Sequence, residues 1–165
     1  MRFFFIPTII LLFFTGKSFS SAWHNTGMVP LLTVGGGCFN VQRDKRTAQF
    51  QIEYKFAKEF FYARPMVGAF ITSKYAFYTY AGIGWDLHLS KYIVITPSFA
   101  PGLYFQGKDK NLGFPVEFRT CMELAYKFKN KARLGAEFYH LSNASLSNRN
   151  PGEESLVIFY SLPLN

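Results

Sequence analysis

The sequence predicts an all-β protein, an eight-stranded antiparallel transmembrane β-barrel, and three observations support this prediction. From residue 28 onward, apolar and polar residues alternate with the period of two that strands show, and no segment has a convincing helical period. Several of these long strands carry charged residues along one face, and aromatic residues gather near the strand ends. A membrane-spanning barrel combines these features, because its outer face meets lipid while its interior is polar.

The alternation is clearest in residues 49–56, where every even position is apolar or aromatic and every odd position is polar. Residues 75–89 and 116–128 repeat the pattern. In a soluble sandwich the apolar face would be the inside, but the number of charges favours the inverse arrangement. In a small barrel without an open channel, these charges would then fill the interior as a paired network, which we expect to include Glu117, Arg119, Glu123 and Glu137.

Eight segments have the strand pattern, an even number as single-chain bacterial barrels require. Pro65, Pro97 and Pro101 fall in the third and fifth segments, where we expect bulges or strand ends. If both termini are periplasmic, the short inner turns are expected at 58–59, 90–91 and 130–131, and the outer loops at 43–46, 106–112 and 145–152. The expected strands are 29–42, 47–57, 62–73, 75–89, 91–103, 114–128, 131–143 and 154–164.

Residues 1–22 have the layout of a secretory signal peptide. Arg2 provides a positive start, residues 3–14 are largely apolar, and Ser18 to Ala22 supply small residues for cleavage. The apolar run is too short to span a membrane comfortably. We therefore expect a cleaved leader at 1–22 and a single barrel domain at 23–165, exported to the bacterial outer membrane as a multi-pass protein.

Charge and composition narrow the classes of partner. Arg2 and Lys17 are the only charged residues of the leader, so its removal lowers the net charge from +8 to +6. A basic, aromatic-rich exported chain suggests anionic partners such as phosphorylated lipid head groups. Nucleic acid is a poor fit, because no basic cluster interleaves with stacking aromatics in a recognisable module. The sequence leaves open whether the barrel forms a homodimer.

Cofactor and metal motifs are not evident. Cys38 and Cys121 lack metal-ligand spacing, and they could form one disulfide or remain two isolated thiols. The glycines at 35–37 sit in a strand-like run, with no following lysine or helix signal for a phosphate loop. We expect neither a metal nor a cofactor.

A candidate catalytic group lies near the C-terminus. His140 and Ser142 are two residues apart on the apolar face of a predicted strand, with Cβ atoms roughly 6–7 Å apart. A serine hydroxyl becomes a nucleophile when a neighbouring base takes its proton. Glu153 and Glu154 follow a Pro-Gly turn, and only Glu154 shares the parity of the apolar face of the next strand. If the two strands pair, Glu154 is the acid expected to orient the imidazole.

The segment after the serine could complete an acyl-transfer site. Asn143 could donate its side-chain amide to a developing oxyanion, assisted by the backbone N–H groups of Ala144 or Ser145. Taken singly, these residues have ordinary structural interpretations, with Asn143 ending a strand and Glu154 lying in a solvated loop. Their placement favours function, because a histidine and an acid on a lipid-facing surface are energetically costly.

Three segments resemble the lipid A 3-O-deacylase family of PagL-type outer-membrane barrels: 97–104, 118–124, and 140–144 with the following Asn150-Pro151-Gly152 and acid. The resemblance covers roughly residues 29–164. It implies an eight-stranded barrel that removes the acyl chain esterified at the 3-position of lipid A, with Ser142 as nucleophile, His140 as base, Glu154 as orienting acid and Asn143 as oxyanion donor. Family members commonly have glycine where Ser145 stands.

The resemblance therefore implies a serine esterase that acts on lipid A, the anchor of lipopolysaccharide, among outer-membrane lipids. Two other classes remain open. A structural barrel or adhesin would carry the same three residues without catalysis, and a lipocalin-like carrier would be soluble without detergent. The carrier would also need a more consistently apolar interior face than this sequence provides.

Overall fold

The computed structural model describes residues 23–24, 27–42 and 46–164, so the expected leader lies outside the described residues. Among the described residues, no helix is long and apolar enough to cross a bilayer. The described residues form eight long strands: β2 (Leu31–Phe39), β3 (Thr47–Lys55), β5 (Arg64–Thr72), β6 (Phe77–Gly84), β8 (Ile93–Phe105), β9 (Val116–Lys127), β10 (Arg133–Ser142) and β11 (Glu153–Pro163). The two-residue strands are β1 (Trp23–His24), β4 (Glu59–Phe60) and β7 (Leu87–His88).

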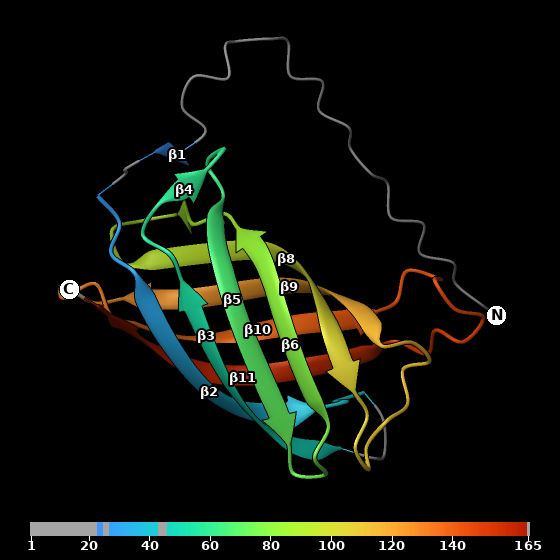
Figure 1. The fold of residues 1–165 in the computed structure, drawn as a ribbon. Helices are drawn as coiled ribbons and strands as arrows, with labels where there is room; N and C mark the ends of the chain where they lie inside the picture. Colours follow the sequence, from blue (N-terminus) through green and yellow to red (C-terminus); the bar gives the residue numbers. More distant parts are fainter. Residues whose placement is uncertain (1–22, 25–26, 43–45, 165) are drawn as a thin grey trace, which may run out of the picture.

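The eight long strands form a closed antiparallel barrel, which confirms the predicted fold class. Each strand pairs with its neighbours along the chain, β11 closes onto β2, and β6 pairs with β8. Figure 1 shows β2, β3, β5 and β6 crossing in front of β8 to β11 at a steep angle. Because the barrel is closed, no long strand has an unpaired edge, and its backbone N–H and C=O groups need no water in the bilayer.

Burial along each strand confirms the inverse arrangement. On β10, Leu134 and Phe138 are 47% and 43% exposed, whereas Glu137 and Tyr139, on the other face, are buried. The same alternation runs along β3 and β11. The apolar side chains thus form the outer wall and the charged ones fill the interior, as the period of two requires.

The buried charges form a connected network inside the barrel. Arg119 pairs with Glu137, with 2.6 Å between Nη2 and Oε1, and its guanidinium lies 4.4 Å from the centre of the Tyr139 ring. Lys55 contacts Glu123 directly and lies 3.5 Å from Glu53. The Lys55–Glu123 pair joins opposite walls, whereas Arg119 and Glu137 lie on adjacent strands. These pairs confirm the expected charged interior for Arg119, Glu123 and Glu137. The predicted pairing is wrong for Glu117, whose buried carboxylate has no hydrogen-bond partner among the described residues.

We call one end of the barrel the site end; it is formed by residues 40–42 and 46 and by connections 73–76, 106–115 and 143–152. The opposite end, formed by 56–63, 85–92 and 128–132, is the turn end. The prediction of two-residue turns is wrong for the first two turn-end connections, each of which contains a short strand, β4 or β7. The fourth long strand accordingly ends at Gly84 rather than 89.

Asp86 explains why that strand ends early. Its carboxylate accepts two hydrogen bonds from Arg133, at 3.0 and 2.6 Å, and one from Arg64 at 3.1 Å. Burial alone would raise the pKa of Asp86, but the bonds and charge of Arg133 hold this pKa well below its ordinary value. The chain therefore turns inward at Asp86 instead of continuing the ladder.

Pro97 and Pro101 do not end the fifth long strand, because β8 runs through both. Their ring nitrogens face β6, where the ladder is incomplete. The Pro97 carbonyl accepts from Trp85 N on that side, and Pro101 has no partner in the β6–β8 register. A missing N–H is tolerated where no ladder bond is needed.

Cys38 and Cys121 are free thiols in the structure.

Candidate active site

His140 and Glu154 meet on the outer wall near the site end. They are direct partners in the β10–β11 register, and His140 Nδ1 lies 3.2 Å from Glu154 Oε1. Both side chains are partly exposed, at 42% for His140 and 23% for Glu154. Glu153 is instead fully buried and accepts a hydrogen bond from Asn40 N. The parity argument therefore selected the glutamate that contacts the histidine.

Ser142 lies two residues beyond His140 on the same face of β10 and is half-buried. Its partner in the register on β9 is Phe118, whose ring stacks on Phe99 at 5.8 Å between centroids. The three polar groups thus lie on an aromatic outer surface rather than in a polar cleft. An ester carbonyl at the end of an acyl chain could reach this surface from lipid.

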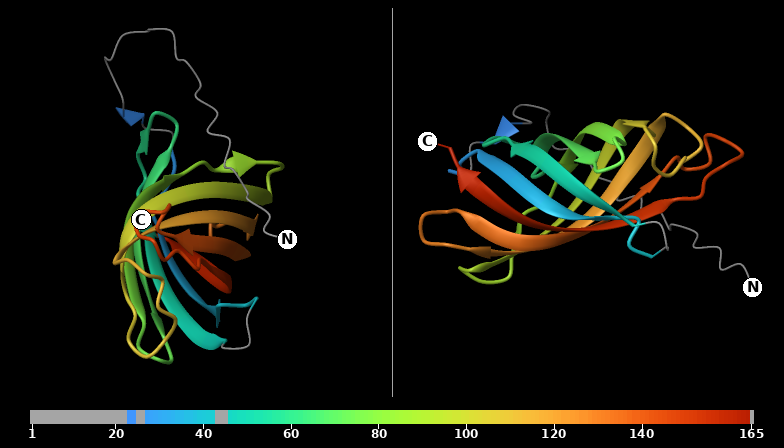
Figure 2. Two further views of the ribbon diagram at one scale, coloured as in Figure 1. Left: turned by 90° about the vertical axis from the view of Figure 1, so that its right-hand side faces the viewer. Right: turned by 90° about the horizontal axis from the view of Figure 1, so that it is seen from below.

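The Asn143 side chain lies on the other face and differs from the expectation. It is fully buried, and its Nδ2 donates to Leu112 O at 3.1 Å and to Arg149 O at 2.9 Å. With both amide protons engaged, the side chain links connections 106–115 and 143–152, which lie side by side at the site end (Figures 1 and 2). Asn143 therefore positions the segment that follows Ser142, and its side chain is not presented to the serine.

The backbone after Asn143 makes a tight left-handed turn. Ala144 and Ser145 have φ values of 50° and 64°, and Ser145 N donates to Asn143 Oδ1 at 3.1 Å. The described hydrogen bonds leave Ala144 N–H without an acceptor. Of the three expected oxyanion donors, this N–H is the one that the contacts leave available.

We expect Ser145→Gly to stabilise this turn. A non-glycine residue in the left-handed region costs roughly 1–2 kcal/mol, so glycine should raise the free energy of unfolding by about 1 kcal/mol, after allowance for its greater freedom in the unfolded chain. Urea unfolding of the folded barrel in detergent micelles measures this change. Ser147→Gly, in the same connection at a residue without positive φ, is the control and should not stabilise.

Gly152 packs against the imidazole, a contact that sequence reasoning missed although it noted the Pro-Gly turn. Gly152 has a φ of 61°, and a Cβ built on it would lie 2.8 Å from His140 Cε1 and 3.5 Å from Nε2. The absence of a side chain lets the turn approach the ring on its Nε2 side. The sequence signal for this contact is a glycine that directly precedes an acid and follows the strand carrying His140.

Gly152→Ala should therefore disturb His140 more than it disturbs the barrel. The methyl group must displace the ring by several tenths of an ångström, and alanine also strains the positive φ of residue 152. If His140 acts as the base, we expect kcat to fall about 10- to 100-fold, since small misplacements of a catalytic group have effects of this size. Ester hydrolysis with folded protein measures the loss. Gly27→Ala places alanine at a similar positive φ, but no atom lies within 4 Å of the added Cβ, so activity should be retained in that control.

No group of three or more His, Cys, Asp or Glu side chains suited to a metal ion occurs in the part of the chain that the structure describes. The arrangement on the outer wall instead offers a base, a hydroxyl and an orienting carboxylate. That combination is the one used for nucleophilic acyl transfer.

Fold and site together define the class: a membrane-type β-barrel with a candidate esterase group on its outer wall. A family model described as PagL, lipid A 3-O-deacylase, matches residues 11–163. The chain therefore belongs to the lipid A 3-O-deacylase (PagL) family.

One curated relative shares sequence with part of this chain, and two solved structures share its fold. Lipid A deacylase PagL of Pseudomonas aeruginosa is 38% identical over 56 residues, which are 34% of this chain and 32% of that protein. The match thus spans about a third of the curated relative. The crystal structure of the outer membrane enzyme PagL has a TM-score of 0.62 at 16% identity, covering 81% of this chain and 99% of that one. The structure of the Yersinia pestis outer membrane protein Ail has a TM-score of 0.51 at 12% sequence identity, and the match covers 82% of this chain and 99% of Ail.

Proposed function

We propose that this protein is a lipid A 3-O-deacylase, a serine esterase that hydrolyses the ester-linked acyl chain at the 3-position of lipid A. The observation that carries the proposal is the contact between His140 Nδ1 and Glu154 Oε1 on the same outer face as Ser142. Membership of the family and the name of the Pseudomonas relative support the reaction and the substrate.

The geometry supports a division of roles among the three residues. Glu154 favours the histidine tautomer with its proton on Nδ1, which leaves Nε2 to accept the Ser142 proton. The serine oxygen then attacks the ester carbonyl, and the Ala144 N–H, which the described hydrogen bonds leave without an acceptor, would stabilise the oxyanion. His140 passes the proton to the departing sugar oxygen, and the ester of Ser142 is hydrolysed by water in a second, equivalent step.

The proposed location follows from the substrate. Lipid A would occupy the outer leaflet of the outer membrane, so the site end faces the cell exterior and the turn end the periplasm. Exposed Phe138 and Leu156, on the strands that carry His140 and Glu154, would contact the acyl chains directly. A cleaved leader at 1–22 supplies the export route in this proposal.

Incubating the purified, folded barrel with lipid A and recording mass spectra tests the function. We expect the loss of one 3-hydroxyacyl group and the appearance of the free fatty acid. Lipid A that already lacks the 3-O-acyl chain is the matched control substrate and should remain intact. An unchanged spectrum of complete lipid A with folded protein would instead favour a structural barrel or adhesin.

A further inference from the structure

The turn end of the barrel contains a basic pocket that lies at the opposite end from His140. Its volume is about 340 Å³, and its lining includes five basic side chains, His88, Arg64, Lys127, Lys131 and Arg133, together with residues 27–29 and Leu31. No carboxylate lines it. The proposed deacylation does not use this pocket.

The buried charges next to the pocket balance one another, so they do not neutralise its lysines. Lys55, Arg64 and Arg133 are matched by the three carboxylates with which they pair, those of Glu53, Asp86 and Glu123. Lys127 and Lys131 are left as an excess of two positive charges at the mouth. The pKa of His88 lies below its ordinary value because of partial burial and the nearby charge of Lys127.

Unused hydrogen-bond donors accompany this excess charge. Arg133 is 4% exposed, and its Nε has no hydrogen-bond partner among the described residues. The contacts of the described residues give no acceptor to Lys127 Nζ or Lys131 Nζ. The buried Arg133 Nε is costly to leave without a partner, whereas the two lysine ammonium groups reach solvent at the mouth. An acceptor with several oxygens would bond all three groups together.

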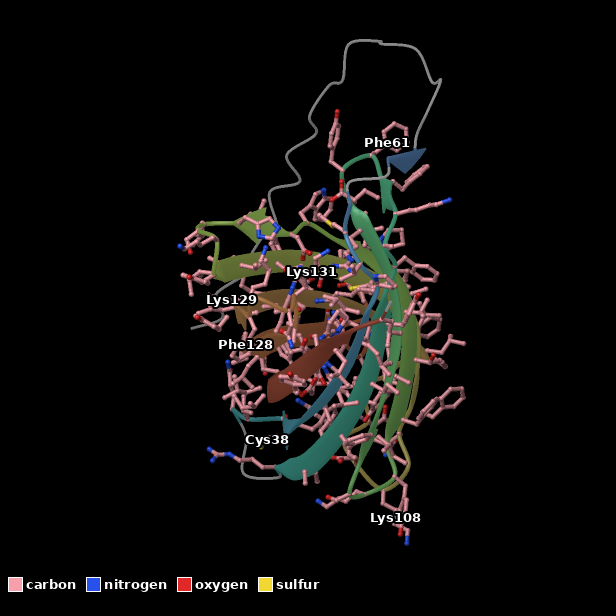
Figure 3. All side chains as sticks on the ribbon, turned by 90° about the vertical axis from the view of Figure 1, so that its left-hand side faces the viewer. Cys38, Phe61, Lys108, Phe128, Lys129 and Lys131 are labelled. Carbon is pink, nitrogen blue, oxygen red and sulfur yellow. The ribbon has the colours of Figure 1, made fainter. Side chains whose placement is uncertain are left out.

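Lys131 belongs to the turn between β9 and β10, residues 128–132, and the outer side of this turn is aromatic rather than basic. Tyr92, Tyr126, Phe128 and Tyr160 line a hollow of about 500 Å³ on the outer wall, with Lys129 at its edge. In Figure 3 the labelled residues Phe128, Lys129 and Lys131 lie near one another. Aromatic side chains at such a rim lie at the level of lipid head groups.

We propose that the basic pocket binds the phosphate group of an anionic ligand. The ligand chemistry is a phosphate oxyanion held by Lys127, Lys131 and Arg133, and the adjoining aromatic hollow favours a phospholipid head group that reaches over the turn. Free phosphate shares this chemistry, so the test has one arm for each source.

In the first arm, inorganic phosphate is titrated into the folded barrel in zwitterionic detergent at constant ionic strength, and amide NMR shifts are followed. We expect saturable shifts at 27–31, 88 and 127–133, with a Kd at least tenfold weaker in the double variant Lys127→Gln/Lys131→Gln. The control Lys58→Gln/Lys91→Gln removes the same charge at the same end, from residues outside the pocket lining, and should bind as the parent does.

In the second arm, the barrel is placed in nanodiscs of phosphatidylglycerol or of phosphatidylcholine. The phosphate-type shifts in phosphatidylglycerol alone, or in both nanodiscs because both lipids carry a phosphodiester, identify a lipid head group as the ligand when the double variant loses them. Saturable phosphate shifts in detergent, with no such shifts in either nanodisc, identify free phosphate. The proposal is overturned if phosphate produces no saturable shifts at the pocket, or if the double variant binds as tightly as the Lys58→Gln/Lys91→Gln control.

Discussion

Ser142→Ala should abolish lipid A deacylation, lowering kcat at least about 10⁴-fold while the barrel still folds. The alcohol is the atom that attacks the ester, and removal of a serine nucleophile leaves only binding and oxyanion stabilisation. Ser142 points outward and is half-buried, so alanine leaves the interior ion pairs in place. The measurement is release of fatty acid from lipid A by protein whose folding is verified by its heat-modifiable electrophoretic mobility.

Two further variants sharpen this result. Ser147→Ala removes a hydroxyl from the same connection and should retain activity. His140→Asn removes the base and should match Ser142→Ala, with no further loss in the double variant, because residues of one catalytic group act as a unit. Full activity in folded Ser142→Ala would falsify the assignment of the nucleophile.

Arg119→Met should destabilise the barrel by about 3–5 kcal/mol, because it leaves a buried carboxylate without its cation. Arg119 is 1% exposed and pairs with Glu137, which would retain only the 2.8 Å hydrogen bond from Gln51 Nε2. Arg119 is also the register partner of Leu141, which stands between His140 and Ser142. The wall that carries the site therefore depends on this interior pair. Equilibrium urea unfolding in lipid vesicles measures the loss.

A double-variant cycle separates the charge effect from lost packing. Arg119→Met/Glu137→Gln removes both charges and should recover most of the stability that Arg119→Met loses. Arg46→Met, at an exposed arginine, should change stability by less than about 0.5 kcal/mol. Equal losses in Arg119→Met and in the double variant would show that packing, not charge, dominates.

The fold could be predicted because the pattern that specifies it is local. Alternation such as that of residues 49–56 fixes which side chain faces which side, whatever the distant partners are. The ends of the strands were less predictable. Gly84 ends β6 because Asp86 turns inward to Arg64 and Arg133, residues far from it in the sequence. The residues next to Asp86 in the sequence do not predict that it pairs with Arg64 and Arg133.

By itself, the sequence determined that the barrel has apolar side chains outside and charged ones inside. It also determined the outward face shared by His140 and Ser142 and the choice of Glu154 over Glu153, since each follows from parity along a strand. Only the tertiary structure decided what crosses between strands and loops: the engagement of Asn143 by two carbonyls, the approach of Gly152 to the imidazole, and the basic pocket at the turn end. Such contacts depend on the register and closure of the whole barrel, which a period of two does not encode.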